Sequence, residues 1–189
     1  MDLAQFVHEA SRRLASEGAP DDPLMPPAHG ALRLLLADHA RRGSPETRDA
    51  IQRLLDRAAR SGFRDHLAGG FHRGRADLEP PAFRFEKRLA DNAFWLRAFA
   101  EWHGVTGDLH CRQVAEGIVA WSLREMRDSS GAFWSSIASG SGATPADGAY
   151  YLWSLGEVSS ILGPARAEEL GKAYRVHPPG LLVLEGSPF

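Results

Sequence analysis

Apolar residues recur every third or fourth position along most of this chain, a spacing that predicts amphipathic helices. Charged residues fill the positions between them, and glycine or proline interrupts the pattern at intervals. The predicted helices cover residues 2–17, 28–42, 45–60, 83–103, 108–126, 154–162 and 164–174. The helix over 83–103 is apolar around so much of its circumference that we expect it to be buried on several sides.

Capping residues mark three of the predicted helix starts. Ser44 precedes Pro45 at the first helical position, and Asp108 stands before the helix that ends near residue 126. Ser154 and Glu157 have the spacing of a capping box. Because the connections around Gly43 and over 104–107 are short, the helices on either side of each should form antiparallel hairpins.

Three stretches are expected to lie outside the helices. Residues 61–82 are rich in glycine and proline, and a connection of that length in a compact domain is often functional. The aromatic runs over 131–136 and 149–153 predict a small two-stranded ribbon. Residues 176–189 lack periodicity, so we expect an irregular C-terminal tail.

Repeated helical hairpins of roughly forty residues are typical of an α/α toroid or a helical solenoid. The pattern does not distinguish between the two architectures. We therefore predict an all-α domain over residues 1–175, made of antiparallel helical hairpins with one small β-ribbon on the rim.

Composition and charge exclude several classes of function. The chain is 43% apolar and 24% charged, which is the range of globular domains, and its net charge of −2 favours neither nucleic acid nor an anionic membrane. Its single cysteine, Cys111, rules out an internal disulfide and is expected to be a buried small side chain on a helix. With no signal-peptide core near Met1 and no long apolar run, we expect a cytoplasmic protein.

A joint motif in the middle of the chain resembles a known family. The motif reads DHLAGGFHR over residues 65–73 and FEKRLADN over residues 85–92. It resembles DHLGGGFHRY and PHFEKMLYDNA in the spermatogenesis-associated, thioredoxin-domain-containing (YyaL-like) family. GAFWS over 131–135 and YLW over 151–153 resemble that family's GGFYSA and FYVW in the same order. The resemblance covers about residues 20 to 175.

The resemblance implies a fold and a field of chemistry. It points to an (α/α)6 toroid similar to six-hairpin glycosidases and N-acylglucosamine 2-epimerases, and so to carbohydrate chemistry by analogy of fold. Seven predicted helices are fewer than the twelve of a full toroid, so we expect a partial toroid. Its apolar cut faces should be covered by self-association or by a partner chain that completes the ring.

Several family positions differ in this chain. Residues 1–189 contain no Cys-x-x-Cys and no segment that resembles a thioredoxin domain, so we do not expect a redox function. Ala68, Gly74 and Arg84 replace a glycine, a tyrosine and a histidine of the pattern. An acidic run after the family's FYSA is replaced by neutral residues from Ile137 onward. These losses remove polar groups from around the motif.

His72 and Glu86 are the best candidates for general acid–base catalysis. A sugar epimerase moves a proton and needs groups that titrate near neutral pH, which a histidine beside a glutamate could supply. The structural alternative is that Glu86 braces the glycine loop through backbone N–H groups, with His72 as its hydrogen-bond partner. The sequence favours this alternative because several neighbouring polar groups are missing.

Further polar and aromatic residues are candidate ligand contacts. The full set is His66, Arg73, Asp91, Asn92, Trp134 and Trp153. Asp91 and Asn92 either line the inner funnel of the toroid or tie their helix to a nearby loop, and Asp91 could pair with Lys87 four residues earlier. Trp134 and Trp153 could stack on a sugar or pack on each other.

No metal site or cofactor is predicted. His66 and His72 have no third ligand at matching spacing, and no Lys-Ser/Thr follows the Gly69–Gly70 pair as it would in a phosphate loop. Two functions therefore stay open. The first is a truncated or divergent six-hairpin-glycosidase-like domain with a scaffold or binding role. The second is a carbohydrate-active enzyme, similar to a sugar epimerase or isomerase, that uses His72 and Glu86 as acid and base.

Overall fold

The computed structural model describes residues 5, 8–13, 29–76, 82–138, 149–174, 183–184 and 187–188. Contacts group the chain into two compact units, Met1–Ile137 and Ala138–Phe189, and each is described by itself. The single domain predicted over residues 1–175 stays a prediction. The helix predicted over residues 2–17 is described at residue 5 and at residues 8–13, which are helical.

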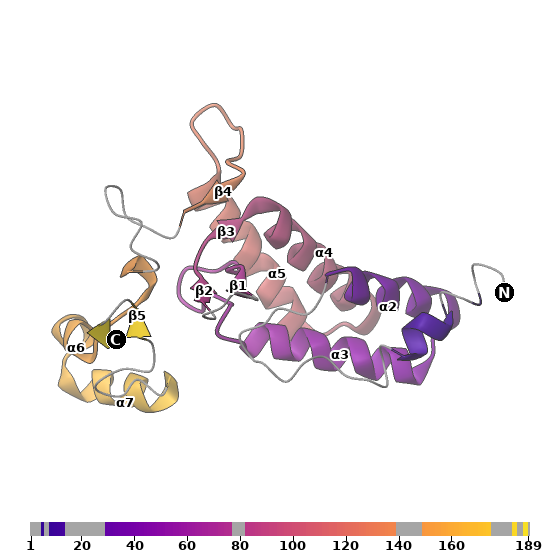
Figure 1. Ribbon diagram of the computed structural model, residues 1–189, viewed down its shortest axis with the longest axis horizontal. Helices are drawn as coiled ribbons and strands as arrows, with labels where there is room; N and C mark the ends of the chain where they lie inside the picture. Colours follow the sequence, from indigo (N-terminus) through magenta and orange to yellow (C-terminus); the bar gives the residue numbers. More distant parts are fainter. Residues whose placement is uncertain are drawn as a thin grey trace. The chain divides into compact units, whose positions relative to one another are not determined.

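Helices dominate the described residues, as predicted, and the strands are two or three residues long (Figure 1). The elements of the first unit are α2 (His29–Arg42), α3 (Pro45–Arg60), β1 (Gly74–Ala76), β2 (Ala82–Arg84), β3 (Lys87–Arg88), α4 (Leu89–Thr106), α5 (Leu109–Trp121), a π-helix (Ser122–Met126) and β4 (Ser136–Ile137). The all-α prediction is confirmed, and the toroid stays a prediction.

The first hairpin, α2–α3, forms as its capping signals predict. The Ser44 hydroxyl accepts the Thr47 N–H at 3.2 Å, and Pro45 occupies the first turn, where its missing N–H costs no intrahelical bond. Gly43 ends the preceding helix at φ 64°. Leu32 and Leu35 are fully buried on α2 and belong to the same apolar core as Ile51 and Leu55 of α3.

The second hairpin, α4–α5, begins later than predicted. The expected helical start at Phe83 is wrong, because Ala82–Arg84 pairs with Gly74–Ala76 as an antiparallel ribbon. Lys87–Arg88 pairs with Ser136–Ile137, so α4 begins only at Leu89. Arg88 gives no side-chain cap, and the carbonyl of Ser135 accepts the Leu89 N–H at 2.9 Å instead. Neighbouring strands thus take the backbone groups that a longer helix would have used.

The predicted ribbon between 131–136 and 149–153 is also wrong in its pairing. The first run does form a strand, β4, but its partner is β3. Ala149–Tyr151 is a short 3-10 helix in the second unit. Aromatic alternation predicted extended structure near residue 136, but it carried no information about which segment would lie beside it.

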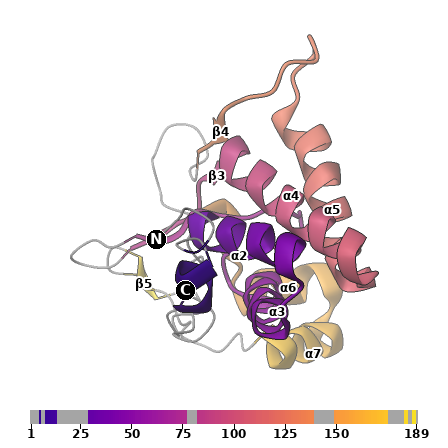
Figure 2. The same ribbon diagram turned by 90° about the vertical axis from the view of Figure 1, so that its right-hand side faces the viewer.

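Aromatic rings fill the core of the first unit. Phe71 lies 5.1 Å from Trp95 and 6.0 Å from Phe99, measured between ring centroids, and Phe63 contacts both Phe71 and Trp95. Helix α2 packs against α3 and α4, and α4 packs against α5 (Figures 1 and 2). Phe63 and Phe71 come from the connection between hairpins, so the core extends from the helices into that loop.

The second unit contains α6 (Leu155–Leu162) and α7 (Pro164–Tyr174), which pack on each other. The predicted capping box is present, because Ser154 accepts the Glu157 N–H and Glu157 accepts the Ser154 N–H. Val183–Leu184 (β5) pairs with Ser187–Pro188 (β6) inside the tail that was expected to be irregular. No helix in the described ranges has the length and apolarity that a bilayer crossing requires.

Candidate functional site

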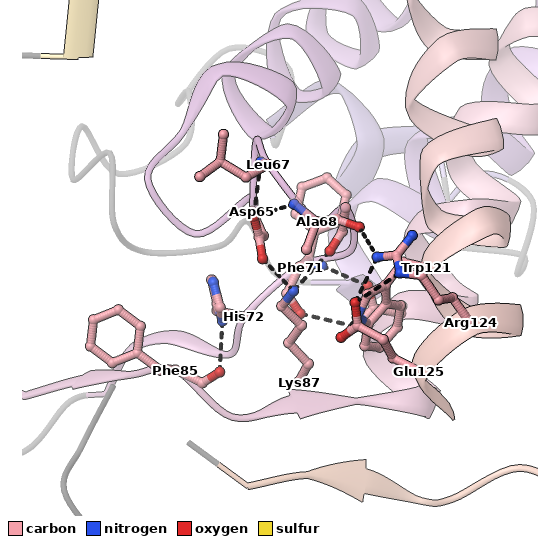
Figure 3. A network of polar contacts seen from close by, with 12 residues as sticks. Asp65, Leu67, Ala68, Phe71, His72, Phe85, Lys87, Trp121, Arg124 and Glu125 are labelled. Carbon is pink, nitrogen blue, oxygen red and sulfur yellow. Dashed lines mark hydrogen bonds and ion pairs between the residues drawn. The ribbon is translucent and has the colours of Figure 1, made fainter. Parts of the chain in front are cut away.

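The glycine loop, residues 63–73, is closed by its own backbone. The Asp65 N–H donates to the Gly70 carbonyl at 3.0 Å, and the Gly69 N–H donates to the Asp65 carbonyl at 3.1 Å. The Asp65 carboxylate then accepts the N–H groups of Leu67 and Ala68 at 2.9 and 2.8 Å (Figure 3). An aspartate that opens a turn commonly satisfies backbone donors in this way.

Both the backbone φ angles and the space beside the loop require glycine at positions 69 and 70. Their φ angles are 89° and 77°, in the left-handed region that side chains disfavour. A Cβ atom on Gly69 would lie 2.7 Å from the Gly117 carbonyl oxygen, and one on Gly70 would lie 2.8 Å from the Trp121 ring. The glycine pair therefore lets the loop lie directly against α5.

Lys87 joins the loop to the start of α4. Its side chain is fully buried, and its ammonium donates to Asp65 Oδ2 at 2.7 Å and to the Gly69 carbonyl at 2.8 Å. The same ammonium lies 5.2 Å from the centroid of a Trp121 ring (Figure 3). The predicted helical pair of Lys87 with Asp91 is wrong, because Lys87 lies in β3, before the helix begins.

For both Lys87 and Asp65, burial disfavours the charged form and the ion pair between them favours it. Desolvation lowers the pKa of Lys87, and its contacts with Asp65 only partly offset that effect. Burial also raises the pKa of Asp65, but hydrogen bonds from Lys87 and from the loop backbone outweigh it and leave this pKa below its usual value. The carboxylate is thus the well-compensated member of the pair.

The end of α5 covers the other side of the loop. Arg124, in the π-helix, donates to the Ala68 carbonyl at 2.6 Å and pairs with Glu125 at 2.6 Å. Glu125 in turn accepts the Trp121 indole N–H at 3.1 Å (Figure 3). The wider π-helical turn places consecutive polar residues beside the loop at the point where Trp121 packs on Gly70.

Asn92 holds the loop from the first turn of α4. The residue is fully buried, and its amide oxygen accepts the Phe71 N–H at 2.7 Å. Its amide nitrogen donates to the carbonyls of Phe71 and Arg88, both at 2.9 Å. Both amide hydrogens and the amide oxygen are therefore used in fixing the backbone, as expected for a buried amide.

His72 and Glu86 come from adjacent segments but face different partners. His72 is 5% exposed, and its Nδ1 lies 2.6 Å from the Phe85 carbonyl, to which the neutral ring donates. Burial lowers the pKa of His72 to about 4. Glu86 is partly exposed and pairs with Arg73 at 3.1 Å, while the Arg73 N–H donates to the Glu86 carbonyl. Because of its lowered pKa, the His72 ring is uncharged at neutral pH.

These signature residues lie in a chain with recognisable relatives. Human spermatogenesis-associated protein 20 is 36% identical to this chain over 112 residues, which are 57% of this chain and 14% of the human protein. Part of the chain is homologous to spermatogenesis-associated protein 20. The rat protein of that name is 35% identical over the same length, and an uncharacterized Caenorhabditis elegans protein is 26% identical over 130 residues. This chain spans about 14% of the mammalian relatives that it matches, and no family model matches it.

The remaining candidate residues are distributed over both units. His66 is exposed within the glycine loop and contacts the Ser61 carbonyl at 3.1 Å. Asp91 is half-buried in the first turn of α4, where its charge raises the pKa of His29 against the larger lowering effect of burial. Trp134 is 58% exposed in the first unit, and Trp153 is 45% exposed in the second.

The described part of the chain contains no group of three His, Cys, Asp or Glu side chains placed to hold a metal ion. Cys111 is buried, as expected, and burial together with the Asp108 carboxylate raises the pKa of its thiol to about 12. A thiolate at neutral pH would need the opposite environment. The surroundings of Cys111 therefore do not favour redox chemistry at this thiol.

Sequence reasoning missed three residues that organise the loop, namely Asp65, Lys87 and Trp121. Asp65 carried a usable signal, since an aspartate ahead of a Gly-Gly pair is a common turn former. Lys87 belongs to the Phe-Glu-Lys segment of the motif, but nothing local indicated that it would be buried. Trp121 gave only the pattern of a core aromatic on a helix.

Proposed function

We propose that this chain is part of an α/α toroid with a scaffold or binding role, in which the glycine-loop motif stabilises the fold. The observation that carries the proposal is the fully buried Lys87, which donates to both Asp65 and Gly69. A buried cation that already has a carboxylate and a carbonyl partner is not available to a substrate. The two antiparallel hairpins α2–α3 and α4–α5 support the toroid part of the proposal.

The state of His72 also supports a structural role. An acid–base catalyst at neutral pH needs a pKa near the working pH, whereas the pKa of His72 is lowered to about 4. Its Nδ1 is engaged by a backbone carbonyl, and Glu86 pairs with Arg73. The motif thus connects the loop, the β1–β2 ribbon and the start of α4.

Substitution of the signature residues tests this role. If the motif has a structural role, His72→Asn and Glu86→Gln should leave any sugar conversion by the purified chain unchanged. The assay is incubation with aldoses and N-acetylhexosamines in D2O, with NMR detection of deuterium at the carbon beside the carbonyl. Conversion that is present in the original chain and lost in both folded variants would overturn the scaffold role.

A carbohydrate-active, epimerase-like enzyme is the second candidate function. The exposed Arg73–Glu86 pair and the exposed Trp134 ring in the same unit favour it, since sugars bind through charged hydrogen bonds and aromatic stacking. In this function His72 and Glu86 are acid and base, and His66, Asp91 and Asn92 are supporting groups. The same deuterium assay distinguishes the two, because an epimerase incorporates solvent deuterium at the inverted carbon.

A further inference from the structure

A stripe of exposed residues follows the outer face of α5 and continues into the first π-helical turn. Successive members are three or four positions apart. Their exposed fractions run from 40% at Val119 to 65% at Leu109. The members are Leu109, Arg112, Glu116, Val119 and Leu123. The alternating spacing of three and four is that of the a and d positions of a coiled coil. The other face of α5 is already buried in the core.

The stripe borders an apolar groove on the hairpin. The groove, with a volume of about 460 Å³, lies between α4 and α5. Leu96 and Ala100 line it from α4, and Val119 and Ala120 line it from α5. An apolar groove bordered by the Arg112–Glu116 pair, on a described helical hairpin, is suited to receiving another helix.

The charges on the stripe decide which helix fits. In an antiparallel pair of α5 helices related by a two-fold axis near residue 114, Arg112 of each copy faces Glu116 of the other. The same register places Leu109 of each copy against Val119 of the other. A parallel pair would instead oppose Arg112 to Arg112 and Glu116 to Glu116, which is repulsive. The stripe is therefore complementary to itself in the antiparallel direction.

We propose that this chain self-associates through α5 as an antiparallel, two-fold dimer, with the second copy covering the stripe and the adjoining groove. Arg112 and Glu116, which pair within one helix at 2.8 Å, exchange partners across the axis. This surface contains none of the glycine-loop residues. Failure of the dimer would therefore leave the proposed role of the loop untouched.

Charge exchange tests the proposal. Arg112→Glu and Glu116→Arg should each weaken self-association by about tenfold or more in sedimentation equilibrium, because like charges then face each other twice. An equimolar mixture of the two variants should form a heterodimer, since one chain then carries only acidic side chains at positions 112 and 116 and the other only basic ones. The double variant, R112E with E116R, should recover the original association.

The matched control is Arg97→Glu on α4, which disrupts another exposed helical pair, Arg97–Glu101, without touching the stripe. It should leave the dimer intact, and Val119→Asp should dissociate it. Circular dichroism should show unchanged helicity in all variants, because every substituted side chain is exposed. A monomeric original chain at every concentration, or equal weakening by Arg97→Glu and Arg112→Glu, would overturn the proposal.

Discussion

The Lys87 ammonium lies 2.7 Å from Asp65 Oδ2, and the two residues are 22 positions apart in the chain. The contact joins the residue that opens the glycine loop to the strand that leads into α4. Lys87 also donates to Gly69, so a single buried side chain holds both ends of the turn. The pair therefore joins the loop that follows α3 to the strand that precedes α4.

Loss of the Lys87 charge should strongly destabilise the fold. Lys87→Met keeps the side-chain length but leaves Asp65 without its cation. The free energy of unfolding, measured in urea, should therefore fall by about 3 kcal/mol. Adding Asp65→Asn should recover part of that loss. The control is Lys172→Met, whose exposed pair with Glu168 should be dispensable. Equal effects at Lys87 and Lys172 would contradict the buried-pair interpretation.

The contact between the glycine loop and α5 predicts a difference between two glycines with similar backbone angles. Gly70→Ala should cost about 3 kcal/mol, because its Cβ would meet the Trp121 ring in addition to the unfavourable φ. Gly107→Ala should cost only about 1 kcal/mol, since its φ is 74° but nothing lies within 4 Å. Thermal and urea unfolding measure both changes. Similar costs at the two positions would show that the contact with α5 is loose.

His72 should make stability depend on pH in mildly acidic solution. Its pKa in the folded chain is about 4, below the 6.5 of an unperturbed histidine, so the unfolded state binds more protons between these values. Stability should then fall as the pH is lowered from 6.5 to 4, by at most about 3 kcal/mol. His72→Asn cannot titrate and should flatten that part of the curve in urea unfolding. An unchanged slope in the variant would assign the effect to other groups.

Cys111 should be inert in the folded chain. Burial and Asp108 raise the pKa of its thiol to about 12, so almost no thiolate exists in mildly alkaline solution. A chromogenic disulfide reagent should react slowly with the native chain and rapidly after denaturation in urea. Reaction of the native chain at the rate of free cysteine would contradict the burial of this residue.

The glycine loop shows the limits of sequence reasoning about a site. Asn92 was expected either to line a funnel or to tie its helix to a loop, and the structure shows that it ties the helix to Phe71. The expected contact between His72 and Glu86 was replaced by separate contacts to Phe85 and Arg73. Which carbonyl or carboxylate a polar side chain reaches depends on segments that the local pattern does not describe.

Local patterns did determine the helices and several of their ends. The Ser44, Asp108 and Ser154 caps form as expected, because each bond joins residues two or three positions apart. The helices predicted over residues 28–42 and 45–60 likewise match α2 and α3 closely, since helical spacing is a property of the segment itself.

Tertiary structure alone decided the start of α4, the partner of β4 and the burial of Lys87. Lys87–Arg88 pairs with Ser136–Ile137 instead of joining the helix, although the sequence pattern predicted residues 83–88 as its first turns. Asp65, Gly69 and Trp121 then surround the ammonium from separate parts of the chain. These contacts join residues far apart in the sequence. They stabilise the chain only when the loop, the strand and α5 pack together, so no local pattern can predict them.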